Sequence, residues 1–222
     1  MFKRIILIVC LVSTVSCAGG GGGDGGGGGR TKETALRLLH GSVIGVPVDV
    51  LIGGLLIQSA RFGDVTSYVP VEKGQTVISV ERANNPGTVE AALTNTFEKD
   101  TEYSLLLYAT SSSGETRAVI FPEPIERPEK GFARVQVVNA LEGSPSVALA
   151  VAGVSTVATP LATASGFVIV PAGLQQIVVR DANGNTLANQ PITLVDRGES
   201  TILVTGSKSL GFVTTRQFDD LD

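Results

Sequence analysis

Hydrophobic and polar residues alternate along several short stretches of the chain, which is the pattern of β-strands with one buried face. In ARVQVV, Val135 and Val137 fall on one side, and Arg134 and Gln136 fall on the other. The stretch LQQIVVRD alternates too, which predicts Ile177 and Val179 inward and Gln176 and Arg180 outward. YSLLLYA and STILVTG contain short apolar runs, which predicts strands that are buried centrally. No stretch sustains the 3.6-residue period of an amphipathic helix.

Turn signals separate these strands at short intervals. Gly53-Gly54, Ser113-Gly114 and Asn183-Gly184 each follow an apolar stretch, and asparagine–glycine is a strong hairpin signal. Roughly seven or eight short strands in about 90 residues are typical of a β-sandwich. The cysteine pair and core tryptophan of immunoglobulin domains are absent, so the prediction is an Ig-like or transthyretin-like sandwich.

The chain contains an internal duplication. A shift of 99 residues aligns ALRLLHGSVIGVPVDVLIGG, which starts at Ala35, with RVQVVNALEGSPSVALAVAG, which starts at Arg134. The same shift pairs Tyr68 with Phe167, which predicts that the two rings fill equivalent core sites. Later in each copy, a shift of 97 aligns FEKDTEYSLLLYA with LVDRGESTILVTG. A period near 100 residues fits a domain better than a solenoid repeat.

The two copies meet at PEPIERPEKG, whose prolines favour an extended, semi-rigid chain. The predicted fold class is therefore all-β, with two tandem antiparallel β-sandwich domains after a signal peptide and a glycine-rich linker. The predicted boundaries are a first sandwich at 33–121, a linker at 122–131, a second sandwich at 132–216 and an acidic tail at 217–222.

The start of the chain has the features of a bacterial lipoprotein signal. Two basic residues precede an apolar run at residues 5–12, which is too short to span a bilayer. Ser16 and Cys17 resemble a lipobox, although Thr14 stands where that motif prefers leucine. The resemblance implies removal of residues 1–16 and acylation of Cys17, with palmitate among the chains. The alternative is a plain secretory peptide with an incidental cysteine.

Ten glycines lie between Ala18 and Arg30 and are interrupted only by Asp24. Glycine has the most backbone entropy to lose on folding, so residues 17–32 are predicted to form a disordered tether. The tract matches a glycine-rich nucleotide-binding pattern only formally, because no strand precedes it and no amphipathic helix follows. Alanine after the lipidated cysteine, instead of aspartate, resembles the sorting signal for the outer membrane. The domains would then face the periplasm or the cell surface.

The first copy resembles the bacterial family named domain of unknown function 4397 (DUF4397). That family opens with an RVVHAS-like strand, followed by VDVYVDG and then FGEVS-Y-VPAG. In the second copy Asn139 and Ala148 replace a histidine and an aspartate, and VPAG is intact at 170–173. The resemblance covers most of residues 35–215 and implies a fold and an envelope location, with no known activity. The pattern in the first copy is carried by His40, Val48-Asp49-Val50, Phe62-Gly63, Tyr68 and Gly74.

Charge and the residue inventory narrow the chemistry. The formal net charge is −4, and becomes −6 after loss of the leader, with no basic cluster, which argues against nucleic acid and against electrostatic docking on anionic lipid. His40 is the only histidine. We expect it to bond the turn after the first strand, and we expect Asp49 to tether a neighbouring turn or face solvent. No serine lies in a nucleophile-elbow context, so no catalytic residue is assigned.

Metal and sugar sites also lack support in the sequence. One histidine and no cysteine beyond residue 17 do not make the usual zinc sets. The acidic end, with Asp219, Asp220 and Asp222, is interpreted as solvated and frayed instead of as a calcium site. There is no tryptophan, and Tyr103 and Tyr108 are expected on opposite faces of one strand, so no aromatic platform for sugars is predicted. No cofactor and no metal are assigned, and the ligand-binding residues are left unassigned.

These observations predict a membrane-anchored envelope lipoprotein that has no catalytic activity and acts as a cell-surface interaction or structural module. Its expected partners are the membrane, through the N-terminal lipid, and an envelope or extracellular macromolecule. Nucleic acid is not an expected partner. The alternative is a periplasm-facing accessory subunit of an envelope complex, and the third possibility is an enzyme with an unrecognised site.

Overall fold

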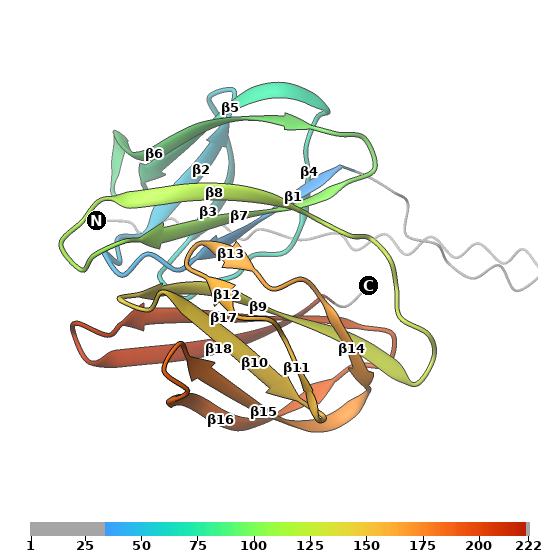
Figure 1. The fold of residues 1–222 in the computed structure, drawn as a ribbon. Coiled ribbons are helices and arrows are strands. Elements are labelled where there is room, and N and C mark those ends of the chain that lie inside the picture. Colours follow the sequence, from blue (N-terminus) through green and yellow to red (C-terminus); the bar gives the residue numbers. More distant parts are fainter. Residues whose placement is uncertain (1–33, 221–222) are drawn as a thin grey trace, which may run out of the picture. The chain divides into compact units, whose positions relative to one another are not determined.

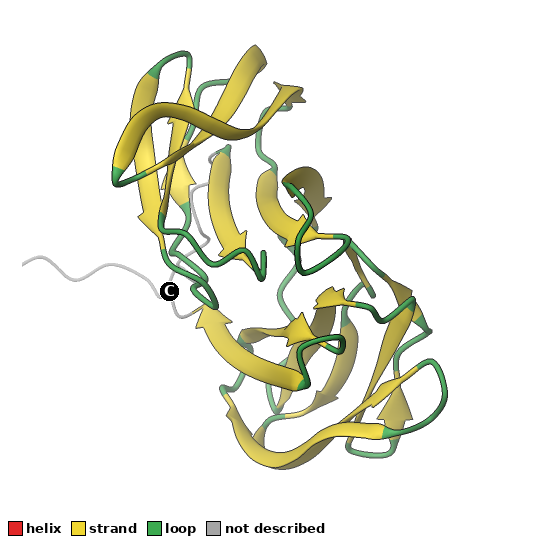
Figure 2. Cartoon of the chain, turned by 90° about the vertical axis from the view of Figure 1, so that its left-hand side faces the viewer, coloured by secondary structure: helices red, strands yellow, loops and turns green. Residues whose placement is uncertain are grey.

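The structure, a computed structural model, describes residues 34–220, so Cys17, the leader and the glycine tract lie outside the described residues. The described chain folds into 18 β-strands joined by turns and loops (Figure 2). It contains no α-helix, and therefore none long and apolar enough to cross a membrane. All of these strands belong to one compact unit, residues 31–222.

The first half of this unit is a sandwich of two four-stranded sheets (Figure 1). One sheet has the order β4-β1-β7-β8 and the other has the order β3-β2-β5-β6. Buried leucine, isoleucine and valine side chains fill the space between them, with Phe97 and Tyr103 packed edge to face. The strands are β1 (Ala35–His40), β2 (Val48–Ile52), β3 (Leu55–Ala60), β4 (Val69–Pro70), β5 (Gly74–Arg82), β6 (Asn85–Phe97), β7 (Glu102–Ala109) and β8 (Thr116–Glu123).

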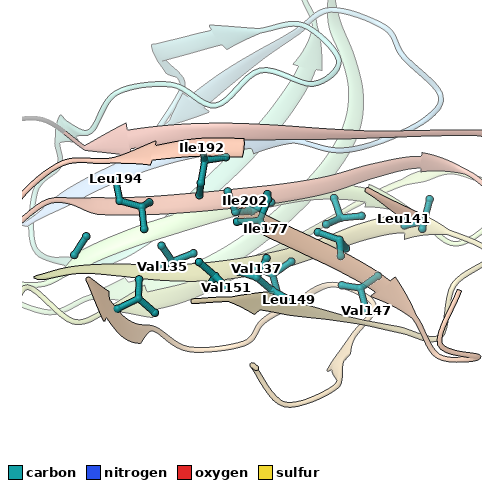
Figure 3. Packing of buried hydrophobic residues seen from close by; sticks show 14 residues of the cluster. Val135, Val137, Leu141, Val147, Leu149, Val151, Ile177, Ile192, Leu194 and Ile202 are labelled. Carbon is teal, nitrogen blue, oxygen red and sulfur yellow. The ribbon is translucent and has the colours of Figure 1, made fainter. Parts of the chain in front are cut away.

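The second half repeats this arrangement. One sheet has the path β13-β9-β17-β18, with β14 also beside β9, and the other has the path β11-β10-β15-β16, with β12 also beside β10. Figure 3 shows the aliphatic side chains that these sheets enclose, including Val137, Leu149 and Ile177. The strands are β9 (Phe132–Glu142), β10 (Ser146–Val151), β11 (Val154–Ser155), β12 (Thr159–Pro160), β13 (Thr163–Ala164), β14 (Val168–Pro171), β15 (Gly173–Asp181), β16 (Thr186–Leu194), β17 (Glu199–Ser207) and β18 (Phe212–Asp220).

The all-β class and the sandwich architecture are confirmed, but the sheets are not wholly antiparallel. β1 pairs with β7 in parallel, and β9 pairs with β17 in parallel. Alternation of hydrophobic residues reports which face is buried and carries no information on strand direction, so this feature was not visible in the sequence. β18 also continues through Asp220, into the segment predicted to be a frayed tail, because its backbone pairs with β17.

Residues aligned by the internal repeat take the same backbone conformations. Gly54 and Gly153, 99 positions apart, have φ angles of 83° and 79° at the turn after β2 and after β10. Asp100 and Arg197, 97 positions apart, have φ angles of 58° and 61°. Left-handed backbone is uncommon for residues other than glycine, so its recurrence at matched non-glycine positions reflects matched turns.

The outer face of the β1–β7 sheet packs against the outer face of the β9–β17 sheet. A third apolar cluster joins the two halves there. Strands β7 and β17 are consequently buried on both faces, which agrees with the central burial that their apolar runs predicted. Arg134 and Gln136 lie on the face of β9 opposite Val135 and Val137, as the alternation predicted, and the other half buries that face as well. The buried members of the cluster are Leu39, Leu106, Val138, Ala140 and Leu203.

Candidate functional site

A network of buried polar side chains lies where the two halves meet, and Arg37 is its centre. Leu36 and Leu38 point into the first core, so alternation along β1 turns Arg37 toward the opposite face. Its Nη2 donates to both carboxylate oxygens of Glu123, at 2.8 and 2.7 Å, and to Oγ1 of Thr201 at 2.9 Å. The Arg37 side chain is 0% exposed. The network therefore ties β1 to β8 in its own half and to β17 in the other.

Glu123, at the end of β8, accepts hydrogen bonds from several elements. Tyr68 donates its hydroxyl to Oε2 at 2.5 Å, Ser104 donates to Oε1 at 2.5 Å, and Gln136 donates its side-chain N–H to Oε1 at 3.1 Å. Burial by itself would raise the pKa of Glu123, but the Arg37 guanidinium and these hydroxyls lower it below its ordinary value. The carboxylate is therefore ionised and fully engaged at neutral pH.

Tyr68 and Phe167 do occupy related places, but the prediction that both fill core sites is wrong. Both are half-buried, and neither belongs to an apolar cluster. The guanidinium carbon of Arg37 lies 4.8 Å from the centre of the Tyr68 ring, and that of Arg134 lies 4.3 Å from the centre of the Phe167 ring. Each ring covers a buried arginine by a cation–π contact. Their shared aromatic character in the repeat therefore reflects this role.

Arg134 and Glu199 form a second buried ion pair. Arg134 Nε donates to Oε2 of Glu199 at 3.0 Å, and its Nη2 donates to the same oxygen and to the backbone oxygen of Pro124. The other carboxylate oxygen of Glu199, Oε1, is buried and has no hydrogen-bond partner in the described structure. Burial raises the pKa of Glu199 to about 7, because its desolvation outweighs the attraction of Arg134.

This raised pKa predicts a pH-dependent stability. Between the ordinary value of 4.5 and about 7, the folded state holds a proton on Glu199 that the unfolded state has released, so the free energy of unfolding falls as pH rises through this window. Glutamine mimics the protonated form. We expect the wild-type protein to lose about 1–3 kcal/mol relative to Glu199→Gln between pH 5 and pH 8.

Urea denaturation of both proteins at several pH values measures this difference. Burial lowers the pKa of His40, which gives a contribution of opposite sign, but that contribution is common to both proteins and cancels in the comparison. Unfolding free energies that stay a constant distance apart from pH 5 to pH 8 would contradict the prediction.

His40 and Asp49 have separate structural roles. The His40 ring is buried, its Nε2 hydrogen-bonds the backbone oxygen of Val46 at 2.9 Å, and the Phe62 ring packs edge-on at 6.4 Å. His40 therefore bonds the loop after β1, as expected. Asp49 accepts a hydrogen bond from the Ser59 hydroxyl at 2.6 Å, so it ties β2 to the neighbouring strand β3 and not to a turn.

The grooves on the first half are open to solvent, and both polar and apolar residues line them. One of about 430 Å³ is lined by Asp100, Glu123 and Glu126, together with Thr101, Pro124 and Ile125. Another of about 390 Å³ lies beside the β2–β3 hairpin and is lined mainly by apolar and small residues. Within residues 34–220, no group of three or more histidine, aspartate or glutamate side chains is placed to hold a metal ion. Asp219 and Asp220 contribute main chain to β18.

These observations define an all-β protein whose buried charged groups hold its sheets together. The family model described as domain of unknown function (DUF4397) matches residues 34–150, more than half of the chain, and the chain belongs to this family. The match covers the first half and continues through β9 to β10. No curated protein matches the sequence.

Two solved structures have weak similarity to this chain. A candidate cell adhesion protein from Bacteroides uniformis has 8% identity and a TM-score of 0.26, with 86% of this chain and 98% of that chain covered. The family 26 carbohydrate-binding module of Amy13K from Eubacterium rectale, solved with maltoheptaose, has 12% identity and a TM-score of 0.26, with 83% and 97% covered. At this level of similarity, neither bears on what this chain binds.

Proposed function

We propose that this protein is a lipid-anchored envelope protein that acts as a non-catalytic interaction or structural module. The observation that carries the proposal is the order of its parts, in which a lipobox-like Cys17 and a glycine tract precede one compact all-β unit. Several acyl chains anchor a protein stably, and a glycine-rich segment separates the folded unit from the headgroups.

The buried network supports a rigid module. Arg37 joins β1 to β8 and β17 through Glu123 and Thr201, and Arg134 joins β9 to β17 and to the chain between the two halves through Glu199 and Pro124. Such a network fixes how the sheets are stacked, at a large cost in desolvation that suits a structural role. We also infer that the second half is a further copy of the same domain, because matched repeat positions share the same backbone conformations.

Replacement of the lipidated residue tests the anchor. We expect Cys17→Ser to leave the protein in the soluble fraction with its leader retained or cleaved elsewhere, whereas the native chain partitions into detergent. Mass spectrometry of the N-terminal peptide should show Cys17 carrying acyl chains and residues 1–16 absent. An unmodified Cys17 in the native protein would contradict the lipoprotein assignment.

Protease treatment of intact and lysed cells tests the side of the membrane. Most of the linker at 122–131 is exposed in the structure, so protease that reaches the protein should cut there and in the tether. Loss of the full-length band in intact cells would support surface display. Protection until lysis would favour the periplasm-facing accessory subunit.

A further inference from the structure

The N-terminal tether joins the folded unit beside an exposed apolar surface. Thr34, the first described residue, accepts a hydrogen bond from the backbone N–H of Val71 at 2.9 Å, and Val71 lines the groove of about 390 Å³ next to the β2–β3 hairpin. Leu55 and Leu56 at the start of β3 are 71% and 60% exposed, and Val77 on β5 is 57% exposed. Leu55 lines the same groove as Val71, and Leu56 and Val77 lie at the same end of their strands.

The second half presents its equivalent end on the same side. Arg37 on β1 bonds Thr201 on β17, and four residues later the backbone oxygen of Gly41 accepts a hydrogen bond from Thr205. β1 and β17 thus run in the same direction. Because β17 is parallel to β9, the first strand of the second half, β1 and β9 also run in the same direction. The ends at which β1 and β9 begin therefore lie together.

Most of the exposed large apolar side chains of the described unit gather at this shared end, which we call the tether end. In the second half, Leu174 at the start of β15 is 74% exposed. A few, including Val89 and Leu210, lie toward the opposite end, near the β5–β6 and β17–β18 turns. The exposed apolar residues of the tether end are Leu55, Leu56, Val77, Phe132, Val154, Ile169, Leu174 and Val195.

We propose that the tether end is a membrane-docking surface whose apolar side chains enter the interfacial region of the lipid bilayer to which the chain is anchored. This inference rests on the proposed lipidation of Cys17. Sixteen residues separate Cys17 from the first described residue. A glycine-rich chain of that length spans about 20–25 Å on average, which keeps the tether end within reach of the bilayer.

The bilayer fits this surface better than an aqueous environment does. Large aliphatic side chains that are exposed to water gain free energy by entering the headgroup–acyl boundary. Glu72 and Lys73 at the groove carry opposite charges, so docking of the tether end on the bilayer does not require anionic lipid. Lipid anchoring also makes the contact intramolecular in effect, which allows a small apolar surface to stay docked.

Tryptophan fluorescence can test docking in the full chain, because the natural sequence contains no tryptophan. Leu56→Trp places a reporter at the tether end, and Val89→Trp places one at the opposite end at a site that is 54% exposed. Each full-length variant, purified from cells, is reconstituted into phosphatidylcholine vesicles with and without brominated lipid. We expect bromolipid to quench the tryptophan at position 56 at least threefold more than that at position 89.

Each outcome is decisive. Equal weak quenching at both sites, with acylated Cys17 verified by mass spectrometry, would overturn the docking surface and leave the anchor intact. Strong quenching at position 56 with unmodified Cys17 would support the surface and refute the proposed anchor. A tryptophan at position 56 that is shielded in vesicle-free detergent, increasingly with protein concentration, would assign the surface to a second copy and overturn the proposal. Circular dichroism of both variants confirms that each is folded.

Discussion

Replacement of Arg37 by alanine is expected to destabilise the protein by about 3–5 kcal/mol. The substitution leaves the Glu123 carboxylate buried without its main cationic partner, and it empties the space that the guanidinium fills between β1 and β17. Loss of one member of a buried ion pair costs far more than the pair contributes as a whole, because the remaining charge stays desolvated. Urea denaturation followed by circular dichroism measures the change.

An ion pair nearer the surface provides the matched control. Arg82 pairs with Glu90, and its side chain is 40% exposed. The same arginine-to-alanine change there should cost about 1 kcal/mol or less, because water and salt screen the pair. An equal loss for Arg37→Ala and Arg82→Ala would refute the assigned role of the buried network.

A double substitution separates the lost charge balance from lost packing. Arg37→Met with Glu123→Gln removes both charges and keeps most of the side-chain volume. We expect this double variant to recover at least half of the stability that Arg37→Met alone loses, since no unpaired buried charge remains. No recovery would mean that shape at this contact matters more than charge.

Strands β15 and β9 show what the alternation of residues in the sequence could predict and what it could not. Alternation correctly placed Ile177 and Val179 inward and Gln176 and Arg180 outward, because β15 has one face in the core and one in water. The same rule placed Arg134 on the face opposite Val135, but it could not show that the other half of the molecule buries that face. Periodicity reports burial by a strand's own sandwich and cannot report what covers the opposite face.

The buried network was missed for a related reason. Arg37 stands in the apolar stretch ALRLLH, and Glu123 stands between prolines in what was interpreted as a linker. A single charged residue within a stretch that is otherwise buried on both faces was the available signal. Its partner could not be found from spacing, because Glu123 lies 86 residues away and only the sheet order β1-β7-β8 brings the two together.

Apolar runs were more informative than alternation. YSLLLYA and STILVTG predicted strands that are buried centrally, and β7 and β17 are the strands whose outer faces build the contact between halves. Tyr103 lies in the first core and Tyr108 packs toward the third cluster, on opposite faces as spacing predicted. Sequence thus indicated that these strands are buried centrally, without showing that the other half covers their outer faces.

The contact between halves depends on a glycine. Gly41, just after β1, donates its N–H to the Leu107 oxygen and accepts from Thr205 Oγ1 at 2.7 Å. A Cβ atom at this position would lie 2.2 Å from Cβ of Ala140 on β9 and 3.1 Å from the Leu107 oxygen. Two backbones therefore approach here more closely than any side chain allows.

We expect Gly41→Ala to destabilise the protein by about 2–3 kcal/mol, because the added methyl group must push β9 away from β1. The clash is mainly with another methyl group, so it can be relieved from the other side. Ala140→Gly alone should cost about 1 kcal/mol through lost packing and greater freedom of the unfolded chain. Combined, the two substitutions exchange the methyl group across the contact.

A double-mutant cycle then decides whether the two positions meet as the structure has them. We expect the Gly41→Ala, Ala140→Gly protein to be at least 1 kcal/mol more stable than the sum of the single changes predicts, since residues in contact are not additive. Limited proteolysis of the linker at 122–131 should rise in Gly41→Ala and return toward wild type in the double variant, because the halves repack. Additive losses would mean that β1 and β9 do not meet at these residues, and the stacked arrangement of the two inner sheets would then have to be abandoned.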